Sequence, residues 1–436
     1  MSTAIVVGGG LAGMAAAVAL AETGFRVRLF EARAALGGRA SSFPPPDAQD
    51  PAELIDNCQH ILLGCCTHLL DFYARLGVRR LIRFHREFHF LERGGRVSRL
   101  RAGRLPAPWR LLASFLRLRF LSAADKLGVM RALAALRRES GRRDLDEITM
   151  AEWLAGQRQT PAAIRRFWQP VLVSAVNEEL DRMAAAHAFQ VFRLAFLGDR
   201  RGFELGVPVA PLSRLYEQGV PGVEVQLRSP VERIAVRDGA AVGAVVNGEL
   251  CEADHIVLAL SPDRAAALAP ELDLDLSPFE YVPITGIHLW FDRPVMALPH
   301  AALVESPIHW VFNKAEGRYL LAVVSAARGL VEMGREEVVS LACRELGDYF
   351  PAARAARLAR AHVVKELRAT FSARPGMEAH RPVAETRIRG LYLAGDWTRT
   401  GWPATMEGAV RSGYLAAEAV TRAAGTPPRV PVPDLL

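Results

Sequence analysis

An apolar run near the N-terminus leads directly into a glycine-rich turn. Residues 4–13 read AIVVGGGLAG, so that a short predicted strand is followed by the spacing Gly8-x-Gly10-x-x-Gly13. Each glycine meets a steric requirement: a tight turn at Gly8, close approach of the backbone to a pyrophosphate at Gly10, and close packing of a helix on a strand at Gly13. The pattern predicts a fold that opens with a βαβ unit and binds a nucleotide.

The residues that follow complete the predicted unit. An Ala-rich helix begins at Leu11 and Ala12, and its N-terminal N–H groups and dipole would face the phosphates. A second strand at residues 26–30 delivers Glu31 and Ala32, and an acid there accepts hydrogen bonds from both ribose hydroxyls. A G-x-G-x-x-G turn alone is also found as an ordinary glycine-rich turn, but strand, helix, strand and acid together indicate nucleotide binding.

Two further runs favour a flavin over a nicotinamide nucleotide. The run LGGRA contains Gly38, which lets the backbone pass close to a ligand, and Arg39, whose forked donors neutralise pyrophosphate charge. Near the other end, the run LYLAGD closes with Gly395 and Asp396, and this acid can accept a hydrogen bond from a ribityl hydroxyl. Nicotinamide enzymes with this fold do not usually carry the first of these runs.

The run GWPATMEG at residues 401–408 leads into a last Ala-rich helix. The first N–H groups there, at Ala404, Thr405 and Met406, would lie under the N1/O2 edge of a flavin and stabilise the anionic reduced ring. Taken alone, the run reads as an ordinary loop before an ordinary helix. Because both ends of the chain carry consistent motifs, we predict that the cofactor is FAD.

These runs resemble the flavin-containing amine oxidase and phytoene desaturase superfamily, which shares GGGLAGMAAA…FEA…LGGRA and LAGDW…GxPATxEGA. Residues 55–65, IDNCQHILLGC, with the closing runs, are similar to the hydroxysqualene dehydroxylases, the bacterial squalene-associated FAD enzymes of hopanoid synthesis. The similarity spans nearly the whole length. It implies that the backbone of Val231 faces the adenine and that residues 56–60 face the isoalloxazine. Cys58 stands where glycine is expected in that family, which bears on backbone conformation beside the flavin.

The resemblance implies an α/β fold, with a Rossmann-like GR2-type FAD-binding domain and an interleaved α+β substrate domain. The FAD-binding domain is predicted to combine residues 1–75, 206–262 and 386–436, the last with a Pro-rich C-terminal tail. Residues 76–205 are predicted to form a mainly helical domain that faces the substrate or a membrane. Residues 263–385 are predicted to hold the sheet and helices of the substrate domain.

Composition agrees with a folded enzyme. The chain has 436 residues, 50% of them hydrophobic, which is enough to bury a large core. No window reads as a complete transmembrane span, and we expect no signal peptide because the first strand begins by residue 4. The 5 cysteines lack C-x-x-C spacing, so we expect reduced thiols, no metal site and a cytoplasmic enzyme.

The net charge of +7 comes almost wholly from arginine. In residues 109–126, aromatic and leucine side chains alternate with Arg110, Arg117, Arg119 and Lys126, a pattern typical of a helix on an anionic bilayer surface. A core-facing helix with a solvated basic edge has the same pattern. Both interpretations stay open, with the inner face of the cell membrane as the expected location under the first. We expect no nucleic-acid partner, because no recognised nucleic-acid module is present.

Asp56, Gln59 and His60 are the candidate catalytic residues. Asp56 and His60 would serve as an acid and its orienting partner, able to protonate a leaving hydroxyl near neutral pH. Alternatively, Asp56 only caps the loop and His60 only binds the backbone. An amine oxidase would place a lysine near the flavin N5, but Lys314 lies in NKAEG, which reads as a hairpin turn and argues against that role.

The sequence therefore predicts FAD-dependent reductive dehydroxylation of hydroxysqualene to squalene. The allylic C–O bond ionises when the hydroxyl is protonated, an apolar tunnel excludes water, and reduced flavin delivers hydride. One alternative is an oxidative, carotenoid-type isoprenoid desaturase, in which electrons flow to the flavin. Another is a non-catalytic flavoprotein that hands on squalene intermediates. No separate nicotinamide domain is evident, so the sequence does not identify the electron donor.

Overall fold

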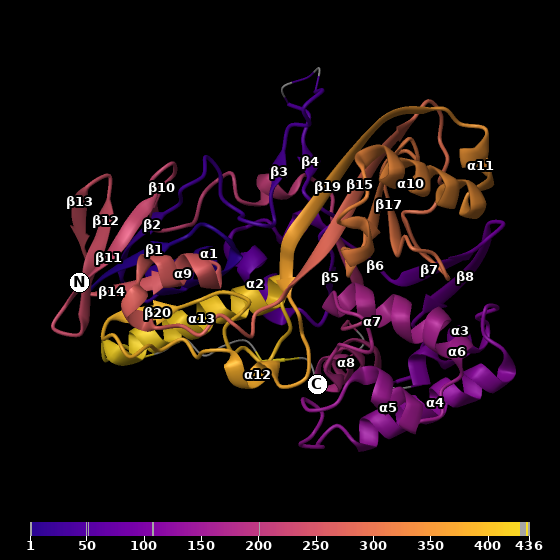
Figure 1. Ribbon diagram of the computed structural model, residues 1–436, viewed down its shortest axis with the longest axis horizontal. Helices are drawn as coiled ribbons and strands as arrows, with labels where there is room; N and C mark the ends of the chain where they lie inside the picture. The colour runs from indigo at the N-terminus through magenta and orange to yellow at the C-terminus, as the bar shows by residue number, and fades with distance from the viewer. Residues whose placement is uncertain are drawn as a thin grey trace.

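A five-stranded parallel sheet carries the glycine-rich turn at the end of its central strand (Figure 1). The computed structural model describes residues 2–48, 50, 52–106, 109–199, 201–427 and 433–434, so most of the Pro-rich run in the predicted tail lies outside the described residues. In spatial order the strands are β10 (Val223–Gln226), β2 (Arg26–Phe30), β1 (Thr3–Val7), β14 (His255–Leu258) and β20 (Leu391–Leu393). All neighbouring pairs are parallel, which confirms the predicted α/β class.

Two Ala-rich helices from opposite ends of the chain lie side by side against this sheet (Figure 1). They are α1 (Leu11–Glu22) and α13 (Met406–Ala423). Residues 11–20 of α1 are all buried, as expected for a helix that is apolar around its whole circumference. A Cβ atom at Gly413 would lie 2.2 Å from the carbonyl oxygen of Ala12, so glycine is needed for this close contact. The first and last segments therefore fold as one unit.

Shorter elements surround the parallel sheet. An antiparallel sheet of β11 (Val231–Arg237), β12 (Ala240–Val246) and β13 (Glu249–Glu252) flanks it together with α9 (Pro262–Leu268). Two small sheets border residues 56–63: β3 (Ser42–Phe43) with β4 (Ile55–Asp56), and β5 (Leu62–Leu63) with β9 (Leu205–Pro208) and β6 (Ile82–His85). Helix α2 (Thr67–Arg75) then packs on α13.

A seven-stranded sheet forms the second half of the molecule. Its strands in spatial order are β19 (Leu358–Phe371), β15 (Tyr281–Phe291), β18 (Tyr319–Val324), β17 (Trp310–Ala315), β16 (His300–Leu303), β7 (Glu87–Glu92) and β8 (Arg96–Arg101). Side chains alternate across it: Trp310 and Phe312 pack on the helical side, and Val311 packs on the side of α10 (Arg335–Tyr349). Strands β7 and β8 come from the segment predicted to be mainly helical; the predicted domain boundaries stay predictions.

The helices on the other face of this sheet form a separate lobe (Figure 1). They are α3 (Leu112–Leu116), α4 (Ala123–Arg138), α5 (Met150–Gly156), α6 (Pro161–Ala163), α7 (Gln169–Val176) and α8 (Ala185–Val191). Ser122 and Thr149 cap α4 and α5 with capping boxes. The helices α11 (Pro351–Arg354) and α12 (Met377–His380) complete the set named in Figure 1. Residues 164–168 and 192–197 are π-helical, a geometry frequent at functional sites.

The single amphipathic helix predicted over residues 109–126 is not formed. The chain there makes a 3₁₀ turn, then α3, and α4 begins only at Ala123. Arg110 is buried, and its Nη1 donates to the carbonyl oxygen of Gly198 at 2.6 Å. The Arg110 guanidinium therefore serves the fold and is not available to a bilayer, whereas Arg117 and Arg119 are exposed.

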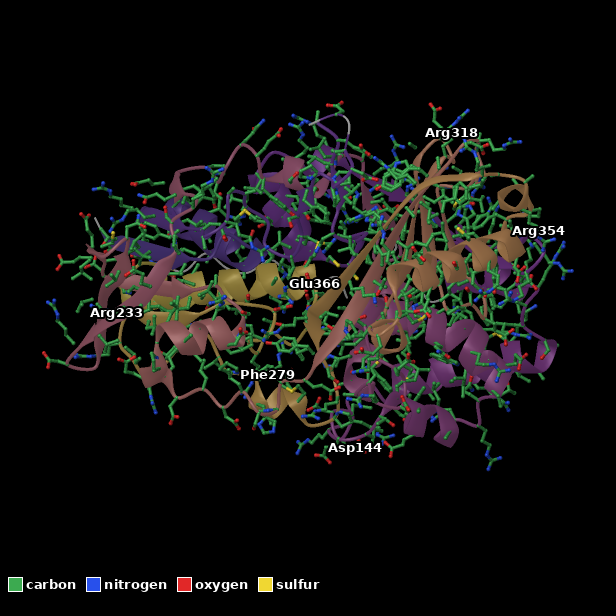
Figure 2. The ribbon with its side chains drawn as sticks, turned by 45° about the horizontal axis from the view of Figure 1, so that its top comes forward. Asp144, Arg233, Phe279, Arg318, Arg354 and Glu366 are labelled. Carbon is green, nitrogen blue, oxygen red and sulfur yellow. The ribbon has the colours of Figure 1, made fainter. Side chains whose placement is uncertain are left out.

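Much of the positive charge projects from the surface. Arg233 lies at one end of the molecule and Arg318 and Arg354 at the other, and all three side chains are exposed (Figure 2). Within the described part of the chain, no helix is both long and apolar enough to cross a bilayer.

Candidate functional site

The three glycines of the N-terminal turn have distinct surroundings. Gly8 has φ +105°, and a Cβ atom there would lie 2.5 Å from the carbonyl oxygen of Ala259. A Cβ atom at Gly13 would lie 1.9 Å from the carbonyl oxygen of Gly8. At Gly10 the nearest atom to an added Cβ is Gly38 Cα, at 4.0 Å. Gly8 and Gly13 are thus required for packing, whereas the space beside Gly10 is open, and the predicted approach of a pyrophosphate to Gly10 and Gly38 stays a prediction.

The helix that begins after Gly10 presents unpaired backbone donors. Among the described residues, no side chain caps the N-terminus of α1, so the first N–H groups, from Leu11 and Ala12 onward, can bind an anion. Glu31 follows β2, and its carboxylate accepts hydrogen bonds from the backbone N–H groups of Gly9 and Arg33, each at 2.7 Å. These bonds fix the carboxylate beside the turn. Its expected role toward the ribose, and the role of Ala32, stay predictions.

Arg39 and Asp396 join the two predicted flavin segments. Arg39 Nη2 lies 2.7 Å from Asp396 Oδ1, and Nη1 donates to the carbonyl oxygen of Ala369 at 2.6 Å. The negative charge of Asp396 raises the pKa of the Arg39 guanidinium above its ordinary value. Gly395 has φ +147°, and a Cβ atom there would lie 2.5 Å from Trp397 Nε1. The geometry suits a pyrophosphate and ribityl contact, which stays a prediction.

The remaining predicted cofactor residues lie at the starts of helix α13 and strand β11. Thr405 is the N-cap of α13, and its hydroxyl accepts a hydrogen bond from the N–H of Gly408 at 3.0 Å. Ala404 precedes this cap and Met406 begins the helix. Val231 begins β11 and pairs with Val246. The helix start therefore lies where the sequence predicts, and the contacts of these residues with a flavin stay predictions.

Asp56 and Gln59 meet Lys314 in one polar cluster. Lys314 Nζ lies 3.2 Å from Asp56 Oδ2 and 3.1 Å from Gln59 Oε1. Asp56 Oδ1 accepts hydrogen bonds from Ser42 Oγ at 2.7 Å and from the backbone N–H of Leu212 at 2.9 Å. Both oxygens of this buried carboxylate therefore accept hydrogen bonds, and Oδ2 accepts from the Lys314 ammonium group.

Lys314 lies in strand β17, so its predicted placement in a hairpin turn is wrong. The turn comes immediately afterwards, at Glu316 and Gly317. The pairing of β17 with β18 shifts between Asn313 and Ala315, and such an irregularity re-aims the side chain at that point. The local sequence has a turn signal, and only the tertiary fold places Lys314 against the loop of residues 56–60.

The expected partnership of Asp56 and His60 also requires correction. His60 Nδ1 lies 3.1 Å from the carbonyl oxygen of Cys58, and among the described residues no hydrogen bond joins His60 to Asp56. Burial lowers the pKa of His60 and raises the pKa of the Cys58 thiol to about 12. His60 is therefore a neutral imidazole held by its own loop, and Cys58 is a buried, protonated thiol.

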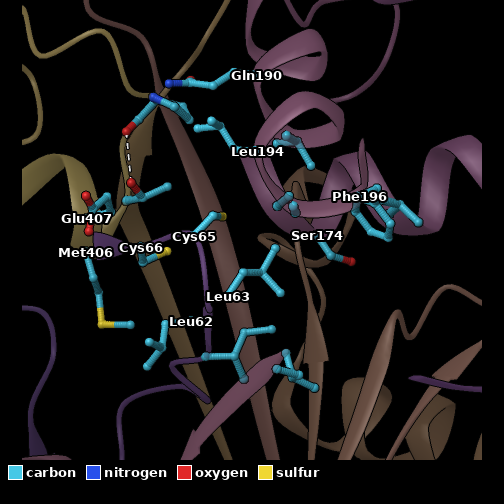
Figure 3. Close-up of a pocket in the computed structure, with 18 of the residues that line it drawn as sticks. Leu62, Leu63, Cys65, Cys66, Ser174, Gln190, Leu194, Phe196, Met406 and Glu407 are labelled. Atoms are coloured by element: carbon cyan, nitrogen blue, oxygen red, sulfur yellow. Dashed lines mark hydrogen bonds between the residues drawn. The ribbon is translucent and has the colours of Figure 1, made fainter. Parts of the chain in front are cut away.

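An apolar pocket lies next to this loop (Figure 3). Cys65, Cys66, Met406 and Glu407 lie on one side and Ser174 and Phe196 on the other, and Leu62, Leu63, Leu194 and Trp310 also contribute. The empty volume is about 1060 Å³, which includes space open to solvent. Glu407 does not make the pocket polar, because its carboxylate accepts from His68 and Leu69. The lining is almost wholly apolar and therefore suits an apolar ligand.

Among the pocket-lining residues, sequence reasoning named Thr405 and Met406, as flavin contacts, but it did not find the others. They come from β7, α7, the π-helical turn at residues 192–197, β17 and the segment before α13. Each segment reads as an ordinary apolar stretch, so no local pattern separates pocket wall from core.

Comparison with known proteins gives consistent matches. A family model described as flavin containing amine oxidoreductase matches residues 11–421. Hydroxysqualene dehydroxylases from Zymomonas mobilis and Rhodopseudomonas palustris are 30% and 32% identical, with 96% and 97% of this chain and 99% of each relative covered. A 15-cis-phytoene desaturase from Synechococcus elongatus is 26% identical, with 95% of each chain covered.

A solved structure shares the fold. Cyclohexylamine oxidase from Brevibacterium oxydans superposes with a TM-score of 0.70 at 18% sequence identity, covering 97% of this chain and 99% of that one. The likeness extends through both halves of the molecule.

Proposed function

The chain belongs to the flavin-containing amine oxidoreductase family, and on that premise we propose that it reduces hydroxysqualene to squalene by replacing an allylic hydroxyl with hydride. The enzyme is an oxidoreductase with FAD as its cofactor. The observation that carries the proposal is the apolar pocket, which shares the loop of residues 56–63 with a polar cluster. Identities of 30% and 32% to two hydroxysqualene dehydroxylases, against 26% and 28% to two phytoene desaturases, further support it.

The chain offers a consistent set of groups to hold FAD. Gly10, Gly38 and the free N–H groups of α1 would bind the pyrophosphate, and Glu31 the adenosine ribose. Asp396 would accept from the ribityl chain, and the start of α13 at Met406 would face the ring. When bound, reduced FAD supplies hydride.

The side chains of the protein must exclude water from the reaction and supply a proton to the leaving hydroxyl. The pocket must exclude water, since water would recapture a delocalised allylic cation. Its wall of leucine, phenylalanine and tryptophan side chains suits that task. A proton must also reach the leaving hydroxyl, and the candidates Asp56, Gln59 and His60 all lie on the loop that borders the pocket.

We further propose that the helical lobe binds an anionic membrane surface. Large apolar side chains are exposed there at Trp109, Leu116 and Leu127, and also at Val97 of β8 and at Leu105, which follows β8; α3 packs against β8. Arg117 and Arg119 are exposed beside them in sequence, and each basic residue near a bilayer contributes about 1 kcal/mol of attraction. Peripheral binding would give access to a substrate that dissolves poorly in water.

The direct test of the proposed function is product analysis. Photoreduced holoenzyme incubated with hydroxysqualene under argon should form squalene, detected by mass spectrometry. Absence of squalene, with desaturation of phytoene by the oxidised enzyme, would establish the oxidative alternative instead. Binding of both isoprenoids without conversion would support a carrier function.

A further inference from the structure

A row of side chains on β17 leads from the apolar pocket to a largely buried cation. Trp310 lines the pocket, and Phe312 packs on the same side of the sheet. Lys314 is two residues further along, and its Nζ reaches Asp56 and Gln59. The loop that carries these two residues continues into the pocket wall at residues 61–63. The cation therefore lies where the β17 row and the loop meet.

Lys314 retains one N–H donor without an acceptor among the described residues. An ammonium group has three donors, and Asp56 Oδ2 and Gln59 Oε1 accept from two of them at 3.2 and 3.1 Å. The lysine side chain is 18% exposed and that of Asp56 is 3% exposed. A hydroxyl group that enters beside Lys314 can accept the remaining hydrogen bond with little competition from water.

Both carboxylate oxygens of Asp56 are committed as acceptors. Its Oδ1 accepts from Ser42 Oγ and from the N–H of Leu212, and its Oδ2 accepts from Lys314. This arrangement anchors the carboxylate to two segments of the FAD-binding half. Asp56 therefore fixes the position of the ammonium group, and Gln59 assists through its side-chain carbonyl.

The other titratable groups around the cluster are poor proton donors at neutral pH. Burial lowers the pKa of His60, which lies on the same loop. Burial also lowers the pKa of His288 on β15 to about 4, and its Nδ1 lies 2.7 Å from the hydroxyl of Tyr319. Burial raises the pKa of the Cys58 thiol to about 12. Lys314 is the group of this cluster that combines a positive charge with an uncommitted donor.

We propose that Lys314 is the catalytic proton donor to the leaving hydroxyl and that Asp56 and Gln59 are positioning residues, an inference that rests on the proposed function. One proton passes from Nζ to the substrate oxygen, the C–O bond breaks, and its electron pair leaves with water. The allylic cation then accepts two electrons as hydride from reduced FAD. Lys314 is left as a neutral amine and regains a proton from solvent.

The test compares Lys314→Met, Lys314→Arg and the double variant Lys314→Met/Asp56→Asn. Lys314→Met leaves the buried Asp56 carboxylate unpaired and is the variant most at risk of misfolding. Lys314→Arg keeps that carboxylate paired, and the double variant removes both charges. Lys365→Met serves as the matched control, because Lys365 Nζ donates to the carbonyl oxygens of Val331 and Met333, outside the cluster.

The first readout is the single-turnover rate at which hydroxysqualene reoxidises reduced flavin. Loss of general acid catalysis should slow this rate by about 10²-fold or more in all three Lys314 variants, with FAD retained. Lys314→Arg should not rescue it, because a guanidinium does not give up a proton in proteins. An acetate ester of hydroxysqualene, whose leaving group needs no proton, should react in the double variant within a fewfold of the wild-type rate. Lys365→Met should match the wild type.

The second readout is binding to the oxidised holoenzyme, which needs no turnover. The wild type should bind hydroxysqualene more tightly than squalene, and Lys314→Met should reduce this preference by about tenfold through the lost hydrogen bond. If the wild type turns over hydroxysqualene and the Lys314 variants keep normal rates and a normal binding preference, the inference is overturned but the proposed function stands. If Lys314→Met loses the binding preference but the wild type shows no turnover, the contact between Lys314 and the hydroxyl is supported and the proposed dehydroxylation is rejected. No preference and no turnover would reject both.

Discussion

Arg39 Nη2 and Asp396 Oδ1 lie 2.7 Å apart although 357 positions separate them in the chain. The ion pair connects the LGGRA run to the LAGD run within the FAD-binding half of the molecule. Asp396 is 7% exposed, so the pair is shielded from solvent on the carboxylate side.

Asp396→Asn should therefore weaken FAD binding. The change removes the charge that holds Arg39 and a charged acceptor for a ribityl hydroxyl. A hydrogen bond to a charged group is worth about 1.5–3 kcal/mol, which corresponds to at least a tenfold loss of affinity. Titration of the apoprotein with FAD, monitored by flavin fluorescence, measures the Kd of FAD. Glu385→Gln is the control, since Glu385 pairs with Arg422 at the exposed surface. An unchanged Kd would contradict the assignment of Asp396.

Two glycine substitutions should separate folding from cofactor binding. Gly13→Ala places a Cβ atom 1.9 Å from the carbonyl oxygen of Gly8, so this variant should fail to fold. At Gly10 the nearest described atom to an added Cβ lies 4.0 Å away, and φ is −76°. The apoprotein of Gly10→Ala should therefore fold but bind FAD poorly. Circular dichroism and FAD content distinguish the two effects. Full FAD occupancy in Gly10→Ala would show that the pyrophosphate does not approach this residue.

Narrowing the pocket should reduce substrate binding without loss of the flavin. Ala175 of α7 lines the pocket, and Ala175→Phe should weaken hydroxysqualene binding by about tenfold through overpacking. Quenching of tryptophan fluorescence provides the affinity. Ala113→Phe, on the exposed side of α3, is the control. Equal affinities in both variants would mean that the isoprenoid binds elsewhere.

His300 should make the protein sensitive to acid. It is buried against Phe88 and Trp310, and burial, with His89 and His85 nearby, lowers its pKa from 6.5 to about 3. The unfolded chain therefore binds this proton at a higher pH than the folded one. Stability should be retained above pH 6.5 and lost as the pH falls from 6.5 toward 3, by at most about 1.4 kcal/mol per pH unit.

His300→Phe should flatten this dependence. Urea unfolding at pH 7 and pH 5 measures the difference in free energy of unfolding between the two conditions for each variant. The exposed His380→Phe should behave like the wild type. If His300→Phe loses as much stability at pH 5 as the wild type, the acid sensitivity arises from other groups.

Membrane binding is tested by flotation with anionic liposomes at low and high salt. A variant with Trp109→Ser, Leu116→Ser, Arg117→Glu and Arg119→Glu should float less than the wild type, and salt should weaken wild-type binding. Arg110 stays unchanged because its buried guanidinium supports the lobe. Val209→Ser with Leu227→Ser removes exposed apolar groups elsewhere and should have no effect. Equal flotation of all three proteins would exclude this surface.

The sequence predicted what local sterics dictate. Gly8, Gly13 and Glu31 occupy their expected places because a βαβ turn leaves few alternatives for these residue types. Lys314 and Arg110 could not be predicted in the same way. A strand irregularity occurs at Lys314, whose side chain reaches Asp56 on a loop 258 positions away, and Arg110 is buried because distant carbonyl oxygens accept hydrogen bonds from its guanidinium. Contacts of that kind depend on how separate segments pack, which no local pattern contains.

The proposed dehydroxylation is tested by anaerobic stopped-flow mixing of photoreduced holoenzyme with hydroxysqualene, followed at the flavin absorbance. Hydroxysqualene should reoxidise the flavin, with one squalene formed per flavin, and neither hydroxysqualene nor squalene should change the absorbance of the oxidised enzyme. Persistence of the reduced flavin in the presence of hydroxysqualene, with bleaching of the oxidised flavin by phytoene, would contradict the proposed dehydroxylation.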